Sequence, residues 1–156
     1  MWRYGPPGIQ GSAETPRPGG GVLVTEIGGW IDRLDPHGRV VWSTTTPTDY
    51  PSDAQLLPDG NALVASYTSP GRIDIISPRG RIAWSYGPPS GPESLDHPSR
   101  AIALPNGTIA VSDDLHHRVV LIDRATKRIV WQYGHFGVPG SASGYLDNPD
   151  GVELLP

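Results

Sequence analysis

Short apolar runs with the composition of β-strands recur along the chain, and a turn follows each of them. The run "ALVAS" (62–66) matches "VLVTE" (22–26) and "IAVSD" (109–113), and "RIDII" (72–76) matches "RVVLI" (118–122). These runs are rich in Val and Ile, which favour strands. No segment of ten or more residues shows helical periodicity, so the pattern predicts an all-β chain.

The turns recur at matching places. "LPDGN" (57–61) returns as "LPNGT" (104–108), while "DPHGRVVW" (35–42) returns as "SPRGRIAW" (77–84) and, with one added residue, as "DRATKRIVW" (123–131). Asp-Gly and Asn-Gly supply the positive φ angle that tight hairpin turns require. A further strand precedes each first turn, at "DAQLLP", "RAIALP" and "GVELLP". Each unit is therefore predicted to contain four strands.

Tryptophan marks the end of each unit, because Trp2, Trp42, Trp84 and Trp131 follow one another at intervals of 40, 42 and 47 residues. Four short strands in about 40 residues are typical of a β-propeller blade. A β-sandwich is the alternative, but three turn motifs that stay in phase favour the propeller. The predicted blades of the single repeat domain 1–156 are about 11–42, 51–84 and 98–131, with a closing strand at about 149–156.

Three blades are fewer than the four to eight of a closed propeller, and they would expose sheet edges and apolar faces. We therefore expect two chains to form one six-bladed ring as a homodimer about a two-fold axis. The alternative is that the chain is half of a longer protein.

The predicted closing strand offers a route to this dimer. Pro16 falls inside the equivalent strand of the first unit, where proline is poorly placed. We expect Val152, Glu153, Leu154 and Leu155 to pair across the dimer as a strand added in trans. A frayed terminal strand is the other interpretation.

One stretch resembles a known repeat. In "VSDDLHHRVVLID" (111–123) a strand ends at Asp113, a short turn follows, and Arg118 opens the next strand. This resembles the NHL repeat, and the ends "RIVWQYG" and "RIAWSYG" are similar to quinoprotein-like propeller repeats. The resemblance covers nearly the whole chain and implies the fold of bacterial six-bladed NHL-like proteins of poorly defined function. Glu26 and Ser66 take the position of Asp113 in the other units.

Composition narrows the possible partners. The net charge is −4 and the 12 Lys and Arg residues are scattered, so no nucleic acid partner is expected. The absence of Cys excludes disulfides and zinc–thiolate sites. No membrane-spanning apolar run and no signal peptide are visible, which leaves the compartment open, with the cytoplasm as the default expectation.

Candidate ligand residues follow from the propeller geometry. The first strand of each unit should line the central channel, so Asp53 and Arg100 are expected near its axis as an ion pair or a polar lining. The loops after the second strands should bring Glu26, Asp113 and His116 to the same loop-rich face. Asp113 has a structural interpretation as well, in which it caps the turn and holds Arg118.

No nucleophile motif or phosphate-binding glycine loop is present. The leading hypothesis is a non-enzymatic scaffold, without a cofactor, that binds a protein or a small polar ligand on the loop-rich face of the channel. The alternative is a metal-assisted hydrolase or lyase, in which carboxylates such as Glu26, Asp53 and Asp113 converge on a metal. His116 and His117 should point to opposite sides of an extended segment, so no metal ligands are assigned.

Overall fold

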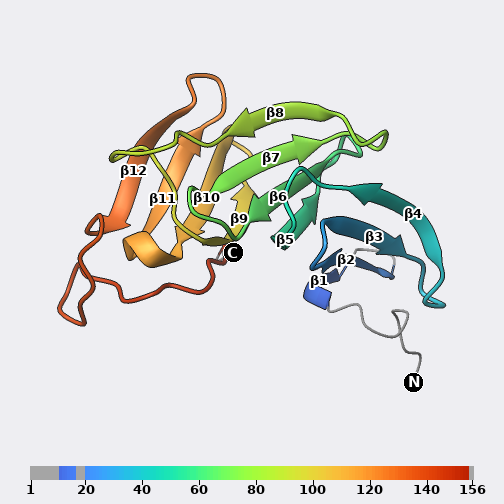
Figure 1. Ribbon diagram of the computed structural model, residues 1–156, viewed down its shortest axis with the longest axis horizontal. Helices are drawn as coiled ribbons and strands as arrows, with labels where there is room; N and C mark the ends of the chain where they lie inside the picture. Colours follow the sequence, from blue (N-terminus) through green and yellow to red (C-terminus); the bar gives the residue numbers. More distant parts are fainter. Residues whose placement is uncertain (1–10, 17–19, 155–156) are drawn as a thin grey trace.

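The structure is a computed structural model that describes the backbone of residues 11–16 and the backbone and side chains of residues 20–154. In this part of the chain, twelve strands form three antiparallel sheets of four strands, and within each sheet the strands follow one another in sequence order. Figure 1 shows the three sheets side by side. The predicted all-β chain of three four-stranded units is confirmed at this level.

Each sheet is formed by one continuous stretch of the chain. Sheet 1 contains β1 (Gly11–Pro16), β2 (Val22–Glu26), β3 (Trp30–Leu34) and β4 (Val40–Thr45). Sheet 2 contains β5 (Pro51–Leu56), β6 (Ala62–Ser66), β7 (Arg72–Ile76) and β8 (Ile82–Tyr86). Sheet 3 contains β9 (Pro98–Ala103), β10 (Thr108–Asp113), β11 (Arg118–Asp123) and β12 (Arg128–Gly134), with the 3-10 helix η1 (Asp114–His116) between β10 and β11.

The hairpin turns form as their sequences predict. In turn 57–61 the N–H of Gly60 donates to the Leu57 carbonyl at 3.0 Å, and Gly60 has a φ of 85°. The Asp59 carboxylate accepts the Asn61 N–H at 3.0 Å. Glycine reaches this positive φ without steric cost, which is why the turn can close within two residues.

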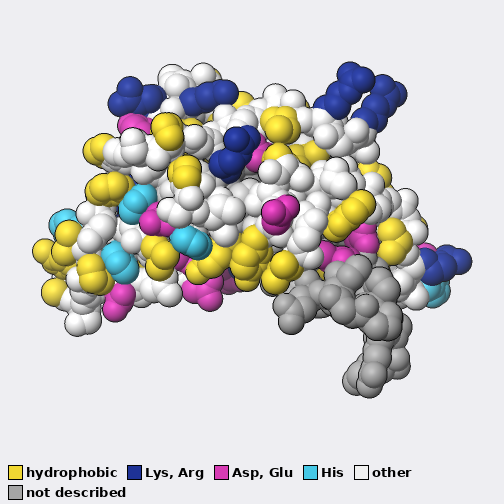
Figure 2. All heavy atoms as spheres, in the orientation of Figure 1, with side chains coloured by type: hydrophobic (Ala, Val, Ile, Leu, Met, Phe, Trp, Pro, Cys, Tyr) yellow, Lys and Arg dark blue, Asp and Glu magenta, His cyan; other side chains and the backbone are white. Residues whose placement is uncertain are grey.

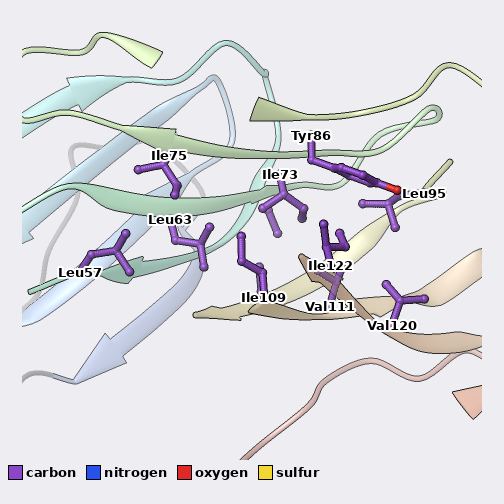
Figure 3. Packing of buried hydrophobic residues seen from close by; sticks show 12 residues of the cluster. Leu57, Leu63, Ile73, Ile75, Tyr86, Leu95, Ile109, Val111, Val120 and Ile122 are labelled. Carbon is purple, nitrogen blue, oxygen red and sulfur yellow. The ribbon is translucent and has the colours of Figure 1, made fainter. Parts of the chain in front are cut away.

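The larger hydrophobic cluster lies between sheets 2 and 3. Figure 3 shows Ile73, Ile75 and Tyr86 of sheet 2 facing Val111 and Ile122 of sheet 3. All of these side chains are 0–2% exposed. A second cluster joins sheet 1 to sheet 2. Its buried members are Leu23, Ile31, Ala54, Ala62, Val64 and Ile76. Neither sheet could bury both of its faces alone, so each needs its neighbour.

The first strands of the three sheets lie next to one another, since β5 contacts both β1 and β9. This is the arrangement expected of the inner strands of adjacent propeller blades. The segment after β12 returns toward these strands, because Glu153 and Leu154 line a groove together with residues of β5 and β9.

One expectation about the ends needs correction. Pro16 does not prevent the first strand of unit one, because β1 forms and pairs with β2, with Pro16 opposite Val22. Pro16 is the last residue of the strand, where a missing N–H is tolerated. The inner edge of β2 is therefore already paired within the chain.

The predicted closing strand is not formed within the chain, because residues 148–154 have no strand structure. Leu155, like Trp2, lies outside the described residues. Pairing of Val152, Glu153 and Leu154 across a dimer stays a prediction. Among the described residues, no helix is long and apolar enough to cross a membrane.

Candidate ligand site in the central groove

A groove of about 340 Å³ lies where the inner strands meet the end of the chain. Three equivalent stretches of the repeat line it. They are Asp53, Ala54 and Gln55 of β5, Arg100, Ala101 and Ile102 of β9, and Glu153 and Leu154 of the last segment. The first strands of two successive units and the segment at the end of the chain therefore build this surface together, where a propeller has its central channel. We call this surface the central groove.

Asp53 connects the two strands that form the floor of the groove. The residue is 9% exposed, and its carboxylate accepts the Ala101 N–H at 3.3 Å. Burial raises the pKa of Asp53, while the Ala101 amide and the Arg100 charge oppose that rise. Gln55 acts in the same way, because its Oε1 accepts the Ala103 N–H at 2.8 Å. These two amides lie on the edge of β9 that no other strand covers. The side chains of Asp53 and Gln55 supply the acceptors that a neighbouring strand would otherwise supply.

Arg100 supplies the positive charge of the groove. Its side chain is 40% exposed, and its Nη1 lies 3.9 Å from Oε1 of Glu153, which is 78% exposed. The predicted ion pair between Asp53 and Arg100 does not form within 4.0 Å in the described chain, and the polar-lining interpretation describes the groove better. The loosely held guanidinium of Arg100 can therefore donate to an anionic group that enters the groove.

A buried carboxylate lies on the loop-rich side. The hydroxyl of Ser99, on β9, donates to Oδ1 of Asp114 at 2.7 Å, and Asp114 is 1% exposed. Burial raises the pKa of Asp114 to about 6; Asp150 and Asp113 add to the rise, and the Ser99 hydrogen bond opposes it. Figure 2 shows histidine and carboxylate side chains gathered on the side where β11, β12 and the loop after β12 lie.

Aromatic rings adjoin this carboxylate. Tyr67 lies edge-on to His97 with ring centroids 4.8 Å apart, and Tyr50 is 5.3 Å from Tyr67. Burial raises the pKa of Tyr67, and the charge of Asp114 adds to the rise. These contacts join the loop after β6 to the connections between sheets, as the propeller interpretation predicts for the loop-rich face.

Asp113 holds Arg118 as predicted, but it does not cap the turn, because its side chain makes no hydrogen bond to the start of η1. Its Oδ2 accepts from Arg118 Nε at 2.8 Å and contacts His116 Nδ1 at 3.0 Å, and its Oδ1 accepts the Asp96 N–H at 2.7 Å. The two carboxylate oxygens are thus engaged within the protein. Neither Asp113 nor His116 lines the central groove.

The sequence did not predict the contacts that Arg118 makes outside its own turn. Its guanidinium donates to the Pro92 and Ser94 carbonyls at 3.0 and 2.8 Å, and it lies over the ring of Phe136 at 4.7 Å. Arg118 therefore anchors the connection between β8 and β9. The glycine- and proline-rich sequence of that connection contains no signal for this contact, because the acceptors are backbone carbonyls.

The remaining candidate residues do not converge. Glu26 ends β2 opposite Trp30, outside the groove, and burial raises its pKa. His117 accepts the Asn148 N–H, whereas His116 contacts Asp113. The two histidines have different partners, but the predicted extended segment is wrong, because His116 ends η1 and His117 has a φ of 55°. In residues 20–154 no group of three or more His, Asp or Glu side chains is arranged to hold a metal ion.

Comparison with known proteins supports the fold and no more. No family model matches the sequence, and no curated protein matches it. A solved structure of streptogramin B lyase is 17% identical, with a TM-score of 0.62 over 88% of this chain and 44% of that chain. Hydrazine synthase of Kuenenia stuttgartiensis is 22% identical, with a TM-score of 0.60 over 79% of this chain and 36% of that one.

A protein of unknown function from Bacteroides caccae is 19% identical and covers 85% of this chain and 64% of its own, with a TM-score of 0.46. This chain therefore spans less than two thirds of the length of each of these structures. The similarity is to β-propeller proteins, and the chain has a β-propeller-like repeat fold.

Proposed function

We propose that this chain is a non-enzymatic binding scaffold whose central groove holds a small polar ligand, and that two copies complete a six-bladed ring. The observation that carries the ligand proposal is the composition of the groove. Three equivalent stretches of the repeat converge there and present one guanidinium, two carboxylates and an amide. The volume of about 340 Å³ suits a small molecule.

The chemistry of the groove narrows the ligand class. Arg100 is partly exposed and loosely paired, so the ligand carries an anionic group, such as a carboxylate, that the guanidinium binds. Glu153 and Asp53 then favour a ligand that also carries hydrogen-bond donors. A protein partner that inserts an acidic side chain would use the same contact.

The number of sheets supports the proposed ring. Closed propellers have four to eight blades, and six is the multiple of three in that range. Each copy would supply three sheets, related by a two-fold axis. The finer assignment to NHL-like repeats rests on Asp113 and Arg118 and is part of this proposal.

We do not propose the alternative function, a metal-assisted hydrolase or lyase. It requires Glu26, Asp53 and Asp113 to converge, whereas Asp113 is engaged by Arg118 and only Asp53 lines the groove. The name of the lyase among the similar structures describes that protein, because 17% identity supports a shared fold alone.

The ligand proposal can be tested with ligand-observed NMR, using glutamate, glycine, acetate, phosphate and methylamine as probes at millimolar concentration. We expect carboxylate-bearing probes to bind the wild-type chain and to lose binding in Arg100→Gln. Arg81→Gln is the matched control, because Arg81 is exposed in a hairpin turn outside the groove. Equal binding to both variants, or binding by none of the anionic probes, would refute the groove as an anion site.

A further inference from the structure

Three aromatic side chains meet on the loop-rich face without stacking face to face. The ring planes of Tyr50 and Tyr67 lie at 57° to each other, and those of Tyr67 and His97 at 74°. In such tilted and edge-on contacts, part of the electron-rich faces of the rings stays clear of the neighbouring ring. Tyr50 is 37% exposed, and the side chain of His97 is 30% exposed. A ligand can therefore reach this group of rings, which we call the aromatic rim.

The aromatic rim forms at the junction of sheets 2 and 3, which pack on each other within the chain. Tyr50 and His97 hold the same position in the repeat, directly before the inner strands β5 and β9. The N–H of Tyr67 donates to the Tyr50 carbonyl at 2.9 Å. The N–H of His97 donates at 2.9 Å to the carbonyl of Thr68, which follows Tyr67. The repeat and these backbone hydrogen bonds therefore place the three rings side by side.

Carboxylates adjoin the aromatic rim. Burial is the main cause of the raised pKa of Tyr67. The charges of three carboxylates, those of Asp114, Asp150 and Asp96, add to the rise. Within residues 20–154, no Lys or Arg nitrogen lies within 4.0 Å of these carboxylates, and the only ion pair among them joins Asp96 to His97. The aromatic rim thus lies in a negative field that no Lys or Arg of the described chain pairs directly.

Asp114 is the carboxylate for which an opposite charge matters most. It is 1% exposed, and its hydrogen bond comes from the Ser99 hydroxyl, which is neutral. Asp113, its neighbour in the chain, has instead the Arg118 guanidinium at 2.8 Å. A carboxylate that is buried without an opposite charge costs free energy. A cation at the aromatic rim would offset part of this cost, and that gain would contribute to binding.

The arrangement suits an organic cation better than a metal ion. A metal ion needs several ligand atoms at about 2–2.6 Å. The described residues contain no group of three or more His, Asp or Glu side chains arranged in this way. An ammonium group needs only an aromatic ring face within about 6 Å of its charge, and methyl groups on its nitrogen add apolar contact with the ring. A nearby carboxylate then balances the charge through space.

We propose that the aromatic rim and Asp114 bind the ammonium group of a small organic cation, with a methylated ammonium as the best fit. The rings of Tyr50 and Tyr67 contact its methyl groups, and Asp114 supplies the balancing charge. This site is separate from the central groove, because none of these residues lines the groove. The two sites share strand β9, where Ser99, which binds Asp114, directly precedes Arg100 of the groove. The cation site does not require that the groove binds an anion.

The test is a titration with tetramethylammonium chloride, followed by NMR of the 15N-labelled full chain at an ionic strength held constant with sodium chloride. We expect saturable binding to the wild type in the millimolar range. Tyr67→Leu removes a ring face and should weaken this binding at least about fivefold. Tyr145→Leu is the matched control. Tyr145 is 36% exposed and contacts His135 in the loop after β12, so the affinity should stay within about twofold.

A second variant tests the charge without removing a ring. Asp114→Asn keeps an acceptor for Ser99 and removes the negative charge, so it should also bind tetramethylammonium at least about fivefold more weakly. Asp59→Asn is its matched control, because Asp59 is exposed in the turn that joins the other ends of β5 and β6. Circular dichroism checks that each variant is folded.

The outcomes separate this site from the central groove. Arg100→Gln should leave tetramethylammonium binding unchanged while it removes carboxylate binding in the groove. Absence of saturable binding to the wild type, or an affinity unchanged in Tyr67→Leu or in Asp114→Asn, would overturn the cation site and leave the groove proposal standing. Displacement of tetramethylammonium by calcium or magnesium chloride at the same ionic strength would show a metal site instead, and would overturn the proposal as well.

Discussion

Arg118 and Asp113 form an ion pair across 2.8 Å in which the side chains are 1% and 0% exposed. They lie at the two ends of the turn between β10 and β11. The same guanidinium binds carbonyls of the connection from sheet 2, so this pair fixes both the turn and the approach of the chain to sheet 3.

Removing the guanidinium should therefore be costly. We expect Arg118→Met to lower the free energy of unfolding by about 3–5 kcal/mol, because the Asp113 carboxylate is left buried without its partner. The measurement is urea unfolding followed by circular dichroism. Arg128→Met is the control: Arg128 is 69% exposed in its pair with Glu93, so that loss should be below about 1 kcal/mol. Equal losses in the two variants would contradict the structural role of the buried pair.

The raised pKa of Asp114 predicts a pH dependence of stability. Because its folded pKa of about 6 lies above the ordinary Asp value of 3.8, the folded state holds the proton more tightly. The unfolding free energy should then fall as the pH rises from about 4 to about 6, and level off above that. Asp114→Asn keeps an acceptor for Ser99 and removes this dependence, so the variant should be the more stable form at pH 7, by up to about 3 kcal/mol.

The comparison is made by unfolding wild type and variant in urea at several pH values. Asp49→Asn, at an exposed position, should follow the wild-type profile. A constant difference between wild type and Asp114→Asn from pH 4 to 7 would show that Asp114 does not titrate in this window.

A glycine at the end of β12 is predicted to be irreplaceable for steric reasons. Gly134 has a φ of 96°, and a Cβ there would lie 2.3 Å from the His117 carbonyl oxygen. We expect Gly134→Ala to cost about 3 kcal/mol of unfolding free energy, since the backbone must shift. Gly137 has a φ of 70° but open space around it, so Gly137→Ala should cost only about 1 kcal/mol. Similar melting temperatures for the two variants would refute the steric argument.

The sequence by itself determined the strands, their order within each sheet and the hairpin turns. These depend on local properties: the run of Val and Ile in "RIDII" favours a strand, and Gly60 permits the φ of its turn whatever lies beyond it. The placement of Asp53 and Arg100 beside one groove also followed from the repeat, because equivalent positions lie side by side when the units stack.

Only the tertiary structure decided which groups meet. Arg100 lies nearest Glu153 rather than Asp53, Gln55 binds an amide of the next strand, and both oxygens of Asp113 are engaged within the protein. These contacts join residues far apart in the chain, and their geometry depends on how the sheets pack and where the connections cross them. Local patterning carries no information about such distances.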